Sequence, residues 1–251
     1  MASRRSSRRR TRDEAGNVKP ADPEVARAAR AGAGERRALV ARLKSAGLCR
    51  DAGVADAMAA VPRHLFVPSA LLGEAYGDHA LPIGYGQTIT QAANVARAAE
   101  LAALTTKARV LEVGTGSGYQ AAVLARLARW VFTLERIPEL AHGAVRLLKA
   151  LGVSNVSIKV FDGSYGWGEH APYDAILVAA AAPEVPEPLV AQLVAGGRLV
   201  IPVGSAGRQK LLVVRKLPNG RTRTEDAGDV AYVPLVGRFG FAPRGKDGGL
   251  A

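Results

Sequence analysis

From Arg109 onward, the chain alternates between short apolar runs and segments in which apolar residues recur at helical spacing. The apolar runs are bounded by turn residues and predict six strands, over 109–113, 130–135, 156–161, 175–178, 198–202 and 211–215. Apolar residues three and four positions apart predict helices over 94–104 and near 119–127, 140–151 and 186–193. This alternation is typical of a doubly wound α/β fold around a mostly parallel sheet.

The part of the chain before residue 93 has a different pattern. Apolar residues at helical spacing predict a helix over 35–46, and a short second helix is expected over 54–60. Prolines and glycines in the segment LPIGYGQTITQ, residues 81–91, predict an ordered loop rather than a regular element. The pattern as a whole predicts a disordered basic tail over 1–34 and a loose C-terminal tail over 241–251. Between them it predicts one domain, with a helical N-terminal part over 35–92 and an α/β core over 93–240.

Composition adds limits to this picture. The chain has 251 residues, of which 48% are hydrophobic, so it can bury a sizeable core. No apolar run reaches the roughly eighteen residues of a membrane span. The single cysteine, Cys49, excludes an internal disulfide and a cysteine-rich metal site, and it fits a reducing cytoplasm. The four histidines lack metal-ligand spacing, so we expect no metal.

The net charge of +12 is concentrated at the start of the chain. Residues 1–50 hold 14 Lys and Arg against 5 Asp and Glu, which gives +9, and the other 201 hold 20 against 17, which gives +3. The arginines are interleaved with serine and threonine and have no aromatic residue beside them, so a solvated tail is favoured. Salt-sensitive, sequence-independent attachment to polyanions is the alternative. We expect no specific nucleic-acid partner, and we favour a monomer.

The segment VLEVGTGSG, residues 110–118, runs a predicted strand directly into three glycines and a helix. Gly114, Gly116 and Gly118 lack Cβ atoms, so the chain can turn tightly and a ligand can approach the amides that open the helix. The spacing is G-x-G-x-G, not the G-x-G-x-x-G of dinucleotide sites, and a purely structural turn is the alternative. The sequence therefore indicates a nucleoside-type ligand.

Two acids at the ends of later strands strengthen this interpretation. Glu135 ends the second predicted strand, where an acid accepts hydrogen bonds from ribose hydroxyls, and an ordinary surface ion pair is the alternative. Asp162 and Gly163 follow the third strand, where the carboxylate could accept from an adenine amino group and the glycine could make room for the ring. An Asp-Gly turn without a ligand is the alternative at this position.

Longer motifs, taken together over 61–235, resemble the protein-L-isoaspartate O-methyltransferase family. The glycine turn alone marks only a class I methyltransferase, whereas LPIGYGQTIT and the segment 171–204 are much more specific. The matching segments are VPRHLFVP, the pair Tyr76 and Asp78, LPIGYGQTIT, VLEVGTGSGYQAAVLA, FTLER, LLKALGVSNV, DGSYGW, APYDAILVAAAAPEVPEPLVAQLVAGGRLVIPVG and YVPL.

The resemblance implies a Rossmann-like fold with a seven-stranded sheet, and S-adenosyl-L-methionine as methyl donor. It implies donor contacts from the glycine turn and from the acids at the strand ends, namely Glu112, Gly114, Gly116, Ser117, Gly118, Glu135, Asp162 and Gly163. It also implies an active-site hydroxyl, which is Thr90 here, and a loop over donor and substrate formed by Gln87, Thr88 and Ile89. The late stretch from Tyr232 to Leu235 matches a segment that flanks the bound peptide.

The implied reaction is methylation of the free α-carboxylate of L-isoaspartyl residues in damaged proteins, followed by succinimide formation and repair. That carboxylate is already ionised at pH 7, so no general base is needed and positioning dominates. Thr90 would orient the attacking oxygen.

Three departures from the family leave an alternative open. The family often has Gln-Pro-Tyr-Met where this chain has Gln91-Ala-Ala-Asn94, and Phe161 and Ala179 replace a usual glycine and a frequent threonine. A related enzyme that methylates ordinary aspartate in one dedicated peptide is therefore a second hypothesis. A basic nucleic-acid-binding protein without catalysis is a third, and the intact LPIGYGQTIT loop argues against it. The sequence lacks the Asn-Pro-Pro-Tyr and Pro-Cys motifs of enzymes that methylate nucleic-acid bases.

Overall fold

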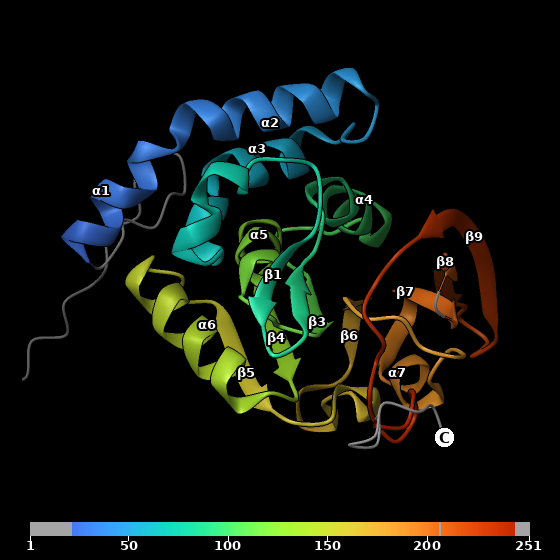
Figure 1. The fold of residues 1–251 in the computed structure, drawn as a ribbon. Helices are drawn as coiled ribbons and strands as arrows, with labels where there is room; N and C mark the ends of the chain where they lie inside the picture. The colour runs from blue at the N-terminus through green and yellow to red at the C-terminus, as the bar shows by residue number, and fades with distance from the viewer. Residues whose placement is uncertain (1–21, 206, 244–251) are drawn as a thin grey trace, which may run out of the picture.

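The computed structural model describes residues 22–205 and 207–243 and shows a twisted seven-stranded sheet with helices on both faces (Figure 1). The sheet order is β5-β4-β3-β6-β7-β8-β9. Neighbours from β5 to β7 are parallel, whereas β8 and β9 add two antiparallel strands at one edge. The strands of this sheet are β3 Arg109–Val113, β4 Trp130–Glu135, β5 Val156–Val160, β6 Tyr173–Val178, β7 Leu193–Ser205, β8 Arg208–Lys216 and β9 Thr222–Val230.

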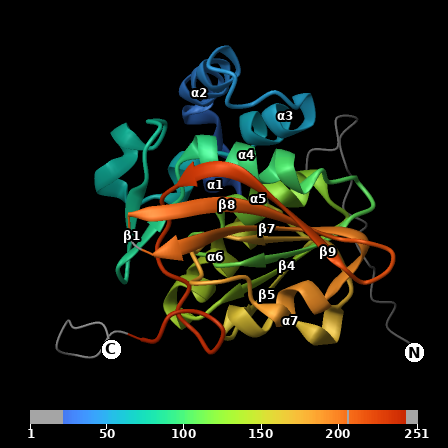
Figure 2. The same ribbon diagram turned by 90° about the vertical axis from the view of Figure 1, so that its right-hand side faces the viewer.

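Most helices lie on one face of the sheet, and α7 lies on the other (Figures 1 and 2). Helices α4, α5 and α6 follow the α/β alternation, while α1, α2 and α3 form the N-terminal layer. The bounds are α1 Pro23–Ala31, α2 Ala33–Ser45, α3 Ala52–Ala60, α4 Ala92–Ala102, α5 Tyr119–Leu127, α6 Pro138–Ala150 and α7 Glu187–Ala191, with 3-10 turns η1 Arg63–Phe66, η2 Ser69–Glu74, η3 Gly163–Tyr165 and η4 Gly168–His170. No described helix is both long enough and apolar enough to cross a membrane.

Successive side chains along each central strand point to opposite faces of the sheet, so the buried residues form two clusters, one on each face. Val110 and Val131 face the layer that contains α4 and α5, whereas their neighbours Leu111 and Phe132 face the opposite cluster, which includes Leu189 of α7. All five residues are buried. Strands covered on both faces read as nearly continuous apolar runs, which is why the sequence pattern located them well.

Three expectations about secondary structure were wrong. The segment 81–91 is not only a loop, since β1 Leu81–Gly84 and β2 Gln87–Ile89 pair in an antiparallel hairpin. The predicted tail over 1–34 overlaps helix α1, which begins after Asp22, whose side chain accepts hydrogen bonds from two backbone amides. Strand β9 was missed because it is a polar edge strand without apolar alternation. Residues 1–21 and 244–251 of the predicted tails lie outside the described residues.

Candidate functional site

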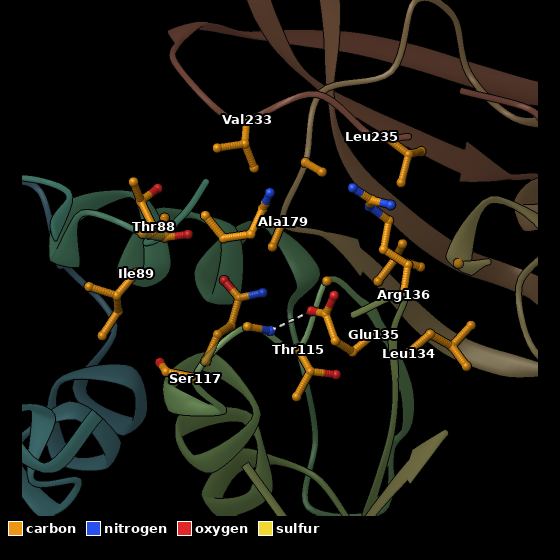
Figure 3. A pocket seen from close by; sticks show the side chains of 18 of the residues that line it. Thr88, Ile89, Thr115, Ser117, Leu134, Glu135, Arg136, Ala179, Val233 and Leu235 are labelled. Atoms are coloured by element: carbon orange, nitrogen blue, oxygen red, sulfur yellow. Dashed lines mark hydrogen bonds between the residues drawn. The ribbon is translucent and has the colours of Figure 1, made fainter. Parts of the chain in front are cut away.

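A cleft lies at the carboxyl ends of β3, β4 and β6, where ligands bind in doubly wound sheets. Its empty volume is about 750 Å³, including space open to solvent. The walls come from the hairpin strand β2, the glycine turn, the end of β4 and the late segment, through residues 87–90, 114–117, 134–136 and 233–236, with Gly163 and Ala179. Figure 3 shows Thr88 and Ile89 on one side of the cleft and Arg136 and Leu235 on the other.

The glycine turn between β3 and α5 forms the floor of the cleft. Gly114 and Gly116 have φ of 95° and 53°, which glycine adopts without strain. A Cβ added at Gly116 would lie 3.3 Å from Cδ1 of Ile83 in the hairpin, so the bare backbone keeps the space between turn and hairpin open. Gly118, with φ of 89°, does not line the cleft, and a Cβ there would lie 3.1 Å from Cβ of Ala144 in α6. The third glycine thus permits close packing of helices.

Glu135 holds the glycine turn against the end of β4. Its Oε2 accepts a hydrogen bond from the Gly116 amide at 2.9 Å, and its Oε1 accepts one from the Ile137 amide at 2.9 Å (Figure 3). The residue is 6% exposed and lines the cleft. Each carboxylate oxygen can accept more than one hydrogen bond, so Glu135 retains acceptor capacity toward the cleft.

Glu112 lies behind the turn and outside the cleft lining. It is fully buried, and its Oε2 accepts a hydrogen bond from Thr133 Oγ1, whose oxygen lies 2.7 Å from Thr115 Oγ1. Burial raises the pKa of Glu112 to about 8, with hydrogen bonds from Thr133 and Gln120 working in the opposite direction. Glu112 is therefore mostly protonated at neutral pH and supports the turn from below.

The Asp162-Gly163 turn after β5 is only partly in the cleft. Gly163 lines it, and a Cβ there would clash with Val113, whereas the Asp162 carboxylate is engaged outside it. Asp162 Oδ1 accepts hydrogen bonds from the amide and hydroxyl of Ser164, and Oδ2 accepts one from the Arg238 amide at 2.8 Å. Asp162 thus fastens the chain after β9 to the turn after β5.

We call this late segment, residues 231–241, the strap. Besides its contact with Asp162, it runs beside the loop after β6, where the Leu235 amide donates to the Ala181 carbonyl at 2.7 Å. The side chain of Gln209 in β8 accepts a hydrogen bond from the Tyr232 amide and donates one to the Tyr232 carbonyl, at 2.7 Å and 3.0 Å. The strap therefore lines one side of the cleft and is held there by hydrogen bonds to Asp162, Ala181 and Gln209.

The hairpin closes the opposite side and leads directly to Thr90. Gln87, Thr88, Ile89 and Thr90 all line the cleft, and Thr90 is half-buried. The start of α4 beyond Thr90 is fixed by Asp78, whose side chain accepts from the Ala93 amide at 3.1 Å. Thr90 thus lines the cleft between two fixed elements, the hairpin and the start of α4.

The sequence-predicted residues that meet in the cleft are Gln87, Thr88, Ile89, Thr90, Gly114, Gly116, Ser117, Glu135 and Gly163. Glu112, Gly118 and Asp162 lie next to it. The lining also contains residues that sequence reasoning did not assign to the site, among them Thr115, Tyr119, Gln120, Arg136 and Val236. Arg136 directly follows Glu135 in the sequence, and this position at the end of β4 could have identified it.

A Rossmann-like sheet with a glycine turn, an acid ending β4 and a cleft over both defines a nucleotide-type binding protein of the class I methyltransferase kind. Residues 34–240 match the family described as protein-L-isoaspartate(D-aspartate) O-methyltransferase. The chain belongs to this family.

Relatives with that name match most of the chain. The protein-L-isoaspartate O-methyltransferase 2 of Geotalea uraniireducens is 49% identical over 207 residues, covering 82% of this chain and 95% of that protein. The protein-L-isoaspartate O-methyltransferase of a Synechococcus species is 54% identical over 194 residues, covering 74% and 79%.

Solved structures agree with these relatives. One protein-L-isoaspartate O-methyltransferase structure superposes with a TM-score of 0.74 at 30% identity, covering 82% of this chain and 67% of that one. A Plasmodium falciparum structure assigned to the same activity, in complex with S-adenosyl-L-homocysteine, gives a TM-score of 0.71 at 26% identity, covering 80% and 98%. The predicted family and fold are confirmed.

Proposed function

We propose that this protein transfers the methyl group of S-adenosyl-L-methionine to the free α-carboxylate of L-isoaspartyl residues in damaged proteins and peptides, which starts their repair through a succinimide. The observation that carries the proposal is the joint placement of the glycine turn, Glu135 and Thr90 around one cleft in a chain of this family. The isoaspartyl protein is the partner.

The residues of the cleft fit the donor. Gly114 and Gly116 present backbone without Cβ atoms, so an amino-acid part of the donor can lie against the turn beside Ser117. Glu135 keeps acceptor capacity for ribose hydroxyls, and Gly163 lines the cleft after β5, where its missing Cβ lets the turn pack against Val113 rather than making room for a ring. When bound, the donor supplies an electrophilic methyl group on a sulfonium.

This chain's own residues then have the task of positioning rather than of proton transfer. An isoaspartyl α-carboxylate is ionised at neutral pH, so it can attack without a base. The Thr90 hydroxyl can donate a hydrogen bond to one carboxylate oxygen and direct the other toward the methyl group. Alignment of this kind supplies on the order of 7 to 11 kcal/mol in favourable cases. The strap and the hairpin line two sides of the cleft in which this alignment would take place.

A paired assay tests the proposal. Purified protein is incubated with methyl-labelled S-adenosyl-L-methionine and an isoaspartyl peptide, beside the same peptide with ordinary aspartate. We expect base-labile label on the isoaspartyl peptide alone. Label on the aspartyl peptide alone would instead support the dedicated-peptide enzyme, and donor binding without any methyl transfer would refute both.

The setting in which we expect this repair is the cytoplasm. Cys49 is buried, and burial raises the pKa of its thiol to about 11, so it stays a thiol rather than a reactive thiolate. A lone inert cysteine is consistent with a reducing compartment.

A further inference from the structure

The tip of the β1–β2 hairpin carries a tyrosine that extends into solvent. Tyr85 is 60% exposed, more than any other large apolar side chain among the described residues, the next being Leu72 at 49%. The glycines on either side of it, Gly84 and Gly86, stand in open space. No ring contact within the described part of the chain involves Tyr85. Core packing therefore does not explain an aromatic residue here.

The backbone conformation at the tip of the hairpin is strained for a tyrosine. Tyr85 has φ of 56°, between Gly84 at 91° and Gly86 at 68°. Glycine adopts such angles freely, whereas a residue with a Cβ is strained, and its neighbours show that glycine suits this turn. The Gln87 side chain donates a hydrogen bond to the Tyr85 carbonyl at 3.3 Å and helps to hold the turn. Strained residues of this kind cluster at functional sites.

The hairpin fixes the position of Tyr85 relative to the cleft. Leu81 pairs with Ile89 across the hairpin, and Ile83 in the same strand lies against the glycine turn. Thr90 lies five positions after Tyr85, which is at most about 18 Å of extended chain. A peptide with its reacting residue at Thr90 has the same spacing per residue, so its flanking residues can reach the tyrosine ring. Tyr85 itself lies outside the cleft lining, so the ring is not placed to contact the donor.

We propose that Tyr85 is a docking residue for the peptide chain that flanks the isoaspartyl residue. The inference rests on the proposed function and deepens it by assigning a specificity-determining contact outside the cleft. The ring packs against the peptide planes and apolar side-chain stems of an extended segment up to about five residues from the reacting carboxylate. Tyrosine suits this role because it offers a large, rigid and amphipathic contact area with few rotatable bonds.

Peptide length separates this role from a structural one. The long acceptor has five residues on each side of the isoaspartyl residue, and the short acceptor has one. For Tyr85→Ala we expect KM for the long acceptor to rise about tenfold, within the range of interface contacts. KM for the short acceptor, kcat for both acceptors, and the Kd for S-adenosyl-L-methionine should stay at wild-type values. Tyr85→Phe retains the aromatic ring, so its KM for the long acceptor should stay close to the wild-type value.

Two further variants control for folding and for general loss of apolar surface. Tyr85→Gly removes the ring together with the backbone strain, so it should fold at least as stably as wild type and still show the raised KM. Leu48→Ala removes a side chain that is 45% exposed in the segment after α2, and it should behave as wild type with both acceptors.

An unchanged KM for the long acceptor, or an equal rise for both acceptors, would overturn the docking role while leaving the proposed function intact. A wild-type protein that binds the donor but methylates neither acceptor would overturn the proposed function, and this inference with it.

Discussion

The buried acid behind the glycine turn gives the protein a specific dependence of stability on pH. Glu112 is fully buried with a pKa of about 8, against 4.5 for an ordinary glutamate. Between these values the folded chain keeps a proton that the unfolded chain has lost. The contribution of Glu112 to stability therefore falls as pH rises from about 4.5 to about 8, and it is constant outside that window.

The magnitude follows from the shift. A difference of 3.5 units at 1.36 kcal/mol per unit gives about 5 kcal/mol as an upper bound for the loss between pH 4.5 and 8. Glu112→Gln replaces the acid with a neutral side chain of the same shape, so it removes this term. At pH 5 the variant and the wild type should have similar free energies of unfolding, and by pH 8 the variant should be more stable by up to about 5 kcal/mol.

Urea denaturation followed by circular dichroism at intervals from pH 5 to pH 9 measures this difference. All other titrating groups are common to both proteins and cancel in the comparison. Glu187→Gln, an exposed acid at the start of α7, is the matched control and should follow the wild-type curve. Parallel curves for wild type and Glu112→Gln across this range would show that the carboxyl is not held in its neutral form.

Three other substitutions test the site. Thr90→Ala should lower kcat about 10- to 100-fold with little change in donor affinity, because a hydrogen bond to a charged group is lost, and Thr90→Ser should restore most of it in steady-state assays. Gly118→Ala forces a Cβ to within 3.1 Å of Ala144 Cβ at φ of 89°, so we expect a loss of about 1 to 3 kcal/mol in stability, seen as a lower Tm; an unchanged Tm would contradict the packing role. Gln209→Ala removes both hydrogen bonds to Tyr232, so amide exchange in the strap should accelerate, which hydrogen exchange would detect.

The sequence predicted the central strands best because burial on both faces makes them continuous apolar runs. The predicted bounds of β3 and β4 match the structure. Strand β8 is longer than expected because its ends carry polar residues, and β7 is longer because it continues through Gly196 and Gly197, which are usually turn residues. The polar strand β9 has no such signal and forms only through pairing with β8. Its presence depends on tertiary context, which local patterns do not contain.

The candidate site was predictable where motif spacing encodes it and less so where distant segments meet. The glycine turn and Glu135 follow from a strand that runs into glycines and from an acid that ends the next strand. The engagement of Asp162 by the Arg238 amide joins residues 76 positions apart, and no local pattern indicates it. The buried network of Glu112 with Thr133 also depends on the register between two strands.

The strap has a consequence for biosynthesis. One wall of the cleft comes from residues 233–236, which leave the ribosome after all seven strands of the sheet have been made. A chain that stops before this point lacks the wall and two of the fastening contacts, however well its sheet has formed. Donor binding stabilises a folded chain by mass action, so we expect premature translation products, whose cleft lacks this wall, to gain less protection from proteolysis than finished chains.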